Sequence, residues 1–432
     1  MSETIAQPEQ AGTVPAGNHN RPLAVVTTLF FMWGFLTSLN DILVPHLKAI
    51  FELDYARAIL VQFSFFSAYL LFSIPSAKVV DGIGHQRTMV AGLLTMAVGA
   101  FLFVPAASLA SYGLFLTALM ILAAGITSLQ VAANPYVIAL GPSETASSRL
   151  NLTQAFNSLG TTIAPKIGGL LILSTVPLLA AAVHRLSPAA LHAYRAQQAS
   201  TVKLPYIVIG VLLAMLAVVI GRSKLPNIEA ARHHLGEPVN DSLWRHRNLV
   251  LGAVGIFCYV GAEVSIGSFL VNYFGQPGIA GLRPEVAAGY VSFYWGGAMV
   301  GRFIGAAILR KFRTGHLLAV CAACAITLVT TSILTGHSVA MWSMLAVGLF
   351  NSIMFPSIFT MGLVELGPLA GDGSGILNMA IVGGAVIPLL EGVIADRIGI
   401  HHAFFVPVIC YFYILYYALI GSRPNSERSH EV

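Results

Sequence analysis

The sequence predicts an all-α integral membrane protein with twelve transmembrane helices in two six-helix bundles. Only 9% of its 432 residues are charged, 56% are hydrophobic and the mean hydropathy is +0.78, whereas soluble domains carry about 25% charged residues. Apolar runs that reach the roughly 20 residues needed for a helical span recur along the chain. The longest polar break, 222–247, separates six of these runs from the other six.

The predicted spans follow the apolar runs in order. They cover 23–45, 58–80, 88–107, 112–140, 152–175, 204–221, 248–271, 287–309, 316–335, 339–362, 375–395 and 402–421. The expected organisation is a cytoplasmic tail (1–22), a first bundle (23–221), a cytoplasmic linker (222–247), a second bundle (248–421) and a second cytoplasmic tail (422–432).

The two halves of the chain share a short repeat. The segment "SSRLN" (147–151) opens the fifth run, and "SGILN" (374–378) opens the eleventh, six spans later. Both have a serine four residues before an asparagine. Weak internal repeats of this kind are typical of membrane proteins built from two related halves.

The distribution of basic residues sets the expected orientation. With the N-terminus inside, fifteen of the 23 Lys and Arg residues, including Arg302, fall on the cytoplasmic side and seven on the other, with Lys166 inside a span. This bias follows the positive-inside rule. Both termini are therefore expected in the cytoplasm and the protein in the plasma membrane, the inner membrane of a bacterium. Residues 1–21 are polar and lack the apolar core of a cleavable signal peptide.

Several function classes leave no signature in this sequence. The net charge of +5 forms no basic stripe with interleaved aromatic residues, so no nucleic-acid partner is expected. All four cysteines lie in apolar runs, where cysteine behaves as a small hydrophobic residue. The 13 histidines show no metal-ligand spacing, and no nucleophile can be matched with a base and an orienting group. We therefore expect no metal, no cofactor and no enzymatic activity.

Asp41 lies in "FLTSLNDILVPHLK" (35–48), towards the end of the first apolar run. An acidic residue at mid-span costs on the order of 2.5 to 3.5 kcal/mol and usually faces a cavity or carries ions. This favours an ion-coupling role for Asp41, with Asn40 beside it as a substrate contact. The alternative is that the span ends near residue 40, which Pro45, as a helix breaker, supports.

Glu263 lies deep in the seventh run and is the second ion-coupling candidate. The cost of a mid-span charge gives the same argument as for Asp41. The alternative is a structural ion pair with Arg302 or Lys166. Glu391 and Asp396, near the end of the eleventh run, are expected to interact with loops.

Amide side chains are concentrated in the fourth and fifth runs. Gln154 and Asn157, three residues apart, share one helical face, as do Gln130 and Asn134 at i, i+4. Amides both donate and accept hydrogen bonds, which suits ligands rich in hydroxyl groups. The alternative is hydrogen bonding between helices, worth about 0.6 kcal/mol in membranes. Pro135 should also bend or break the fourth helix and free backbone carbonyls. Three further substrate-contact candidates in the second half are Asn272, Asn351 and Asn378.

Four segments together resemble one known family. They are "FFMWGFLTSLNDILVPHLK", "LQVAANPYVIALG", "ETASSRLNLTQAFNSLGTTIAP" and "YVGAEVSIGSFLVNYF". They are similar to the fucose-galactose-glucose symporter family of the major facilitator superfamily, most closely to its bacterial glucose/galactose transporters, and the likeness runs from about residue 23 to 421. The loop "AKVVDGIGHQR" (77–87) resembles the superfamily's gating loop at Asp81 and Arg87, although Gly82 replaces the arginine usual there.

The resemblance implies two bundles that rock around a central sugar site, with uptake driven by H⁺ or Na⁺. In the fucose branch an aspartate and a glutamate are linked to proton coupling and an asparagine to substrate binding, and these match Asp41, Gln130 and Asn157. Gln130 cannot titrate. Three possibilities therefore stay open: Asp41 acts alone, Glu263 replaces the missing acid, or the site binds Na⁺.

The resemblance implies glucose, galactose or both as substrate. Fucose or N-acetylglucosamine are the alternatives within the family, and a drug exporter of the same superfamily, with a more apolar cavity, is the alternative outside it. The expected partners are the sugar and membrane lipid, and the expected oligomeric state is a monomer.

Overall fold

The computed structural model describes residues 20–51, 55–109, 111–172, 185–226 and 242–422, and every regular element in these ranges is helical. The longer helices are α1 (Asn20–Phe51), α2 (Tyr55–Ile83), α3 (His85–Ser108), α4 (Tyr112–Ala139), α5 (Ala146–Ile172), α7 (Pro188–Arg222), α8 (Arg247–Phe274), α9 (Pro284–Ile308), α10 (Thr314–Leu334), α11 (His337–Asn351), α12 (Met354–Gly362), α13 (Ala370–Met379), α14 (Gly383–Ile398) and α16 (Phe405–Tyr416). The short elements are η1 (Ser143–Thr145), η2 (Leu243–Arg245), η3 (Gly367–Leu369), η4 (Ala380–Val382), α15 (Ile400–Ala403) and η5 (Tyr417–Gly421).

The predicted all-helical architecture is confirmed for the described part of the chain. The described part of each predicted apolar run falls on one helix or on consecutive helices, and nine segments of the described residues are long and apolar enough to cross a membrane. The sixth helix begins at Pro188, earlier than predicted. Ser187 caps it by accepting a hydrogen bond from Ala190 N at 3.3 Å, and proline is favoured in the first turn of a helix.

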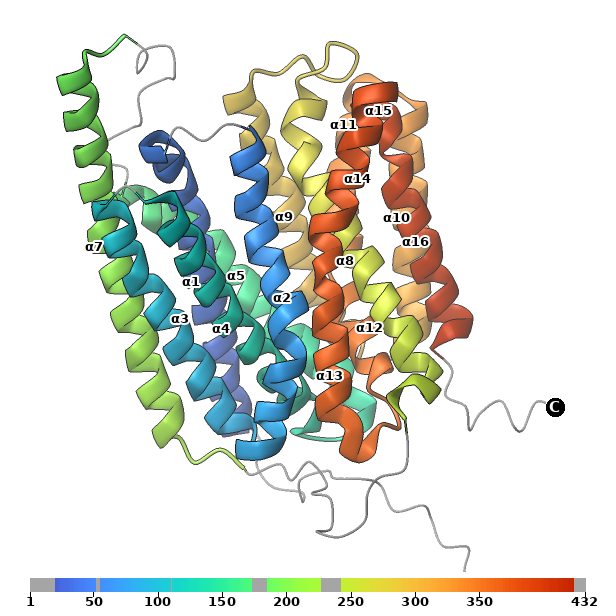
Figure 1. Ribbon diagram of the computed structural model, residues 1–432. Helices are drawn as coiled ribbons and strands as arrows, with labels where there is room; N and C mark the ends of the chain where they lie inside the picture. Colours follow the sequence, from blue (N-terminus) through green and yellow to red (C-terminus); the bar gives the residue numbers. More distant parts are fainter. Residues whose placement is uncertain (1–19, 52–54, 110, 173–184, 227–241, 423–432) are drawn as a thin grey trace, which may run out of the picture.

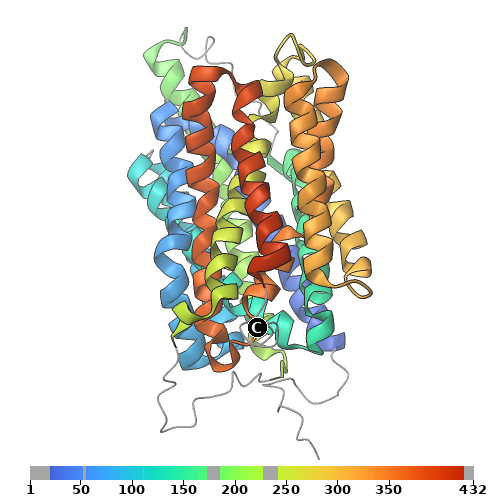
Figure 2. The same ribbon diagram turned by 90° about the vertical axis from the view of Figure 1, so that its right-hand side faces the viewer.

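The helices of the two chain halves pack as two groups. Helices α1 to α5 and α7 contact one another and form the first bundle, and the elements from α8 to η5 form the second bundle. Figure 1 shows the first bundle in blue to green and the second in yellow to red. Figure 2 is seen from the side of the second bundle, whose helices run roughly parallel to one another. The bundles meet where α2 packs on α13 and where α5 packs on α9.

Pro135 does not break the fourth helix, which was one of the two predicted effects; the other, a bend, stays a prediction. Helix α4 continues through it to Ala139. Proline has no N–H, so the carbonyl oxygen of Val131, four residues earlier, lacks its helical donor. Ser374 Oγ of α13 donates to that oxygen at 3.0 Å. The freed carbonyl is thus satisfied by the second bundle, as a buried backbone group in a membrane requires.

The repeated serine-to-asparagine segments both join the bundles. On α5, Ser148 Oγ donates to Ala306 O of α9 at 2.6 Å, and Asn151 Nδ2 donates to Arg302 O at 2.7 Å. On α13, the corresponding segment supplies Ser374, which bonds α4. Each half therefore uses the first turns of one helix to bond backbone carbonyls of the other half. In Figure 1, α13 and the end of α16 lie towards the lower end of the molecule.

Gly160 lets α1 lie directly against α5. A Cβ added at Gly160 would overlap the carbonyl oxygen of Phe31 and would stand 2.8 Å from Phe35 N, both backbone atoms of α1. Gly160→Ala is therefore expected to lower the melting temperature of the purified protein by several degrees, because rigid helix backbones must separate.

Gly296→Ala is the matched control for this prediction. Gly296 lies on α9, and a Cβ added there meets nothing within 4 Å. Alanine is the better helix former, so this variant should melt at or slightly above the wild-type temperature. Equal melting temperatures for the two variants would contradict the close approach of α1 and α5.

Candidate functional site

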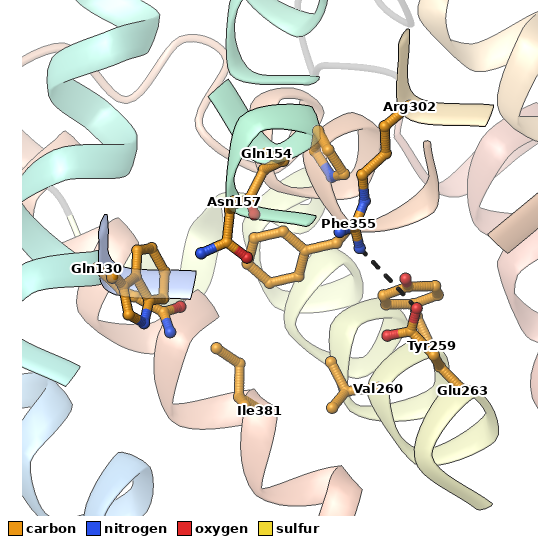
Figure 3. A pocket seen from close by; sticks show the side chains of 11 residues that line it. Gln130, Gln154, Asn157, Tyr259, Val260, Glu263, Arg302, Phe355 and Ile381 are labelled. Atoms are coloured by element: carbon orange, nitrogen blue, oxygen red, sulfur yellow. Dashed lines mark ion pairs between the residues drawn. The ribbon is translucent and has the colours of Figure 1, made fainter. Parts of the chain in front are cut away.

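A cavity of about 180 Å³ lies between the two bundles. It is smaller than the roughly 300 to 1,000 Å³ typical of small-molecule sites. Figure 3 shows both walls. The lining residues are Trp33, Gln130, Gln154 and Asn157 from the first bundle and Tyr259, Val260, Glu263, Arg302, Phe355, Pro356 and Ile381 from the second.

The first-bundle wall presents three amide side chains. Gln130 Nε2 donates to Tyr69 OH at 2.8 Å, and Asn157 Nδ2 donates to Phe30 O at 2.9 Å. Gln154 lies one turn before Asn157 on the same face of α5, as the spacing predicts. Because protein acceptors hold the amide nitrogens of Gln130 and Asn157, their amide oxygens remain to accept hydrogen bonds from a ligand.

The second-bundle wall carries one acidic and one basic side chain. Glu263 Oε1 lies 4.0 Å from Arg302 Nη2, the ion pair drawn in Figure 3. Arg302 Nη1 also donates to Ser158 Oγ of α5, in the first bundle. One guanidinium group therefore joins the carboxylate of its own bundle to a helix of the other. The structural pair of Glu263 with Arg302, an alternative at the sequence level, is present, and it lies in the cavity.

The third contact of Arg302 is a hydrogen bond to a backbone carbonyl that Pro356 leaves without its helical donor. Pro356 has no N–H for the carbonyl oxygen of Ser352, four residues earlier, and the helix is interrupted there between α11 and α12. Arg302 Nε donates to Ser352 O at 3.3 Å. The break between α11 and α12 thus holds the guanidinium in the cavity wall.

Two buried polar atoms of this wall make no hydrogen bond among the described residues. They are Tyr259 OH and Glu263 Oε1, the carboxylate oxygen of the ion pair with Arg302. Buried polar groups normally have partners, so these atoms are positioned to bind a ligand hydroxyl, a water molecule or a cation. The wall can therefore bind both a polar neutral ligand and a positive charge.

Four other predicted amides lie elsewhere. Asn351 is buried between two phenols, since its Nδ2 donates to Tyr294 OH at 2.9 Å and its Oδ1 accepts from Tyr411 OH at 2.8 Å. Its amide is used within the second bundle. Asn378 is buried and donates to Ser374 O at 2.8 Å. The remaining two, also outside the cavity lining, are the fully buried Asn134 and the exposed Asn272.

The predicted gating residues lie away from the cavity. Asp81 and Arg87 are exposed, at the end of α2 and the start of α3. A Cβ on Gly371 would stand 2.8 Å from Asp81 Oδ1, so this carboxylate lies at the beginning of α13 in the other bundle. Asn40 and Asp41 belong to α1, but their side chains lie outside the described residues, and their roles stay predictions.

Arg302 has two predicted placements, among the cytoplasmic charges and as a partner of Glu263. The structure contradicts the first, because Arg302 is half-buried in the cavity wall beside Glu263. The available signal was an arginine inside the apolar run 287–309. Among the described residues, no group of three or more His, Cys, Asp or Glu side chains is arranged to hold a metal ion.

Comparison with known proteins identifies the family. Residues 25–387 match the family model described as the Major Facilitator Superfamily. The chain belongs to this superfamily. It is therefore a membrane transporter and not an enzyme, and the predicted location in the plasma membrane agrees with the family and with the apolar helices.

One similar protein and two solved structures of another refine this assignment. A glucose/galactose transporter of Brucella abortus is 51% identical over 406 residues, which cover 94% of this chain and 95% of that protein. A crystal structure of the Escherichia coli fucose:proton symporter has a TM-score of 0.87 at 32% identity and covers 94% of this chain and 100% of that one. A second FucP structure, in the outward conformation, has a TM-score of 0.85 at 33% identity, with 94% and 99% covered. The resemblance to the fucose-galactose-glucose symporter family is confirmed.

Proposed function

We propose that this transporter takes up a hexose, glucose or galactose, by cation symport through alternating access. The observation that carries the proposal is the cavity between the bundles, with amides on one wall and the Glu263–Arg302 pair on the other. The name of the Brucella relative, a glucose/galactose transporter, supports the hexose. The symporter named in the solved structure is proton-driven, which supports H⁺ as the coupling ion, and Na⁺ is the alternative.

The cavity chemistry suits a sugar. Hydroxyl groups of a hexose can donate to the amide oxygens of Gln130 and Asn157 and accept from the phenol of Tyr259. The rings of Trp33 and Phe355 offer apolar surfaces to the faces of the sugar ring. A drug exporter would need a more apolar cavity, so this lining favours the sugar.

Ion coupling is proposed to act through the charge of Glu263. When a proton or a cation neutralises this carboxylate, its attraction for Arg302 weakens. Arg302 also binds Ser158 of the other bundle, so the change reaches the bundle interface. A ligand shifts a conformational equilibrium only by its differential affinity for the two states, and this contact provides such a difference. Asp41 is proposed as a further coupling carboxylate.

The topology of the proposal follows the sequence. Twelve spans, both termini in the cytoplasm and a linker at 222–247 are proposed, with bundles at 23–221 and 248–421. The first turns of α5 and α13, which bond the opposite bundle, would then close the cytoplasmic side. The transporter is proposed to work as a monomer in lipid. It is proposed to need the coupling ion and no cofactor.

Uptake of labelled glucose into proteoliposomes tests the proposed function. We expect accumulation under an imposed inward H⁺ or Na⁺ gradient and inhibition of at least tenfold by excess galactose. Liposomes without protein are the control. Absence of glucose accumulation under both gradients would contradict the proposal.

Fucose is the second candidate substrate, because two solved structures with this fold are those of a fucose symporter. Excess fucose and excess N-acetylglucosamine in the same assay separate the candidates. Inhibition by fucose with none by galactose would assign the cavity to fucose.

A further inference from the structure

Glu391 is a carboxyl group enclosed inside the second bundle. Its side chain, on α14, is 0% exposed, and it does not line the cavity. Ser265 of α8 donates a hydrogen bond to Oε2, and Oε1 has no hydrogen-bond partner in the described part of the chain. The sequence-based expectation that Glu391 interacts with loops is therefore wrong, because this side of α14 faces α8 in the bundle core.

Among the described residues, a negative charge at this position would have no counter-ion, since no basic side chain forms an ion pair with Glu391. The titratable groups that interact with it electrostatically are Cys410 and Tyr411 of α16, and neither supplies a positive charge. A carboxylate buried without a counter-ion is strongly disfavoured, and such groups become neutral instead.

Among the described residues, the other helices that pack on α14 show no ion pair with Glu391 either. From α15, His401 Nε2 bonds the carbonyl oxygens of Ser332 and Ile333, at 3.1 and 2.9 Å. From α2, Phe66 meets α14 at Gly384. The neighbourhood of the carboxyl thus consists of one hydroxyl, one thiol, phenol and apolar groups.

A proton fits this site better than a metal ion. Metal cations that prefer oxygen take several oxygen ligands, and the described residues near Glu391 offer its own carboxyl and the Ser265 hydroxyl. A protonated carboxyl needs no counter-ion, and the contact with Ser265 remains because a hydroxyl both donates and accepts. We propose that Glu391 and Ser265 form a buried proton-binding site, separate from the cavity, that holds α8 and α14 together.

This site and the cavity carboxylate Glu263 lie on opposite faces of α8. Glu263 and Ser265 are two residues apart on α8, which turns the helix by about 200°. One face of α8 therefore presents Glu263 to the cavity, and the opposite face binds Glu391. The inference does not depend on which sugar is carried or which ion drives its uptake.

The pH dependence of stability tests the proposal. A group that is protonated in the folded protein and ionised in the unfolded one makes the folded state bind more protons, so stability falls as pH rises. One such proton raises the unfolding constant roughly tenfold per pH unit. We expect the melting temperature of the purified full-length protein to fall with rising pH more steeply than that of Glu391→Gln, which cannot ionise. Parallel curves for the two proteins would overturn the proposal.

Asp396→Asn is the matched control, since Asp396 is exposed on the same helix. It should keep the wild-type slope. Infrared spectroscopy supplies a second readout that does not depend on unfolding. The wild-type protein and Asp396→Asn should show the carbonyl stretching band of a protonated carboxylic acid that Glu391→Gln lacks.

Ser265→Ala covers the case in which Glu391→Gln does not fold. This variant keeps the carboxyl and removes its hydroxyl partner, so the band should persist at a shifted position. An unshifted band would overturn the role of Ser265. If Na⁺ raises the wild-type melting temperature and no such band is present, the site holds a metal cation and the proposal is wrong.

Discussion

Glu263→Gln is expected to abolish sugar accumulation while sugar exchange across the membrane continues. Glutamine has nearly the shape of glutamate, so the cavity and the contacts of Tyr259 and Val260 are preserved. It carries no charge and binds no proton at physiological pH, so it cannot link ion binding to Arg302. In proteoliposomes, the gradient-driven accumulation ratio should fall at least tenfold, to the level reached by passive equilibration, while counterflow exchange stays within about threefold of wild type.

Glu144→Gln is the control for this prediction, because Glu144 is an exposed acid in η1 outside the cavity. It should accumulate sugar like the wild-type protein. Wild-type accumulation by Glu263→Gln would remove Glu263 from the coupling mechanism and leave Asp41 as the candidate.

Arg302→Gln is expected to lower both exchange and accumulation at least tenfold. The change leaves the Glu263 carboxylate without a counter-charge and removes the contact with Ser158. Breaking one partner of a buried ion pair is more damaging than removing both. The double variant Glu263→Gln with Arg302→Gln should therefore recover part of the exchange activity, with a coupling of about 1 to 3 kcal/mol between the two positions.

Arg310→Gln serves as the control, since Arg310 is exposed just after α9. It should exchange sugar at the wild-type rate. Strictly additive effects of the two cavity substitutions, measured as initial exchange rates, would contradict the coupling of Glu263 and Arg302.

The fold could be predicted from the sequence because span length and apolarity act locally along the chain. The face shared by Gln154 and Asn157 was also predictable, since the helical repeat alone places them together. In the second bundle, Glu263 and its possible pair with Arg302 could be predicted, but the contacts that hold Arg302 in the cavity wall could not. The role of Arg302 depends on Ser158 and Ser352, which lie on two other helices, and no spacing within α9 reveals them.

The same limit explains why several asparagines were predicted from residue type to contact the substrate although they do not line the cavity. Asn157 and Asn351 look alike in sequence, since each is an asparagine in an apolar run. Asn157 lines the cavity, whereas Asn351 is held between the phenols of Tyr294 and Tyr411. Which neighbour a side chain meets depends on how helices pack against each other, and helical periodicity does not contain that information.

Protection of a cavity cysteine by sugar tests most directly the claim that this cavity holds the hexose. The variant Val260→Cys, in a background with the four native cysteines replaced by alanine, places a thiol in the lining next to Tyr259. The rate of its reaction with a small thiosulfonate reagent should fall at least fivefold with saturating galactose. The rate for Asn272→Cys, at the exposed end of α8, should not change. Equal rates at position 260 with and without sugar, or protection at position 272 instead, would contradict the account.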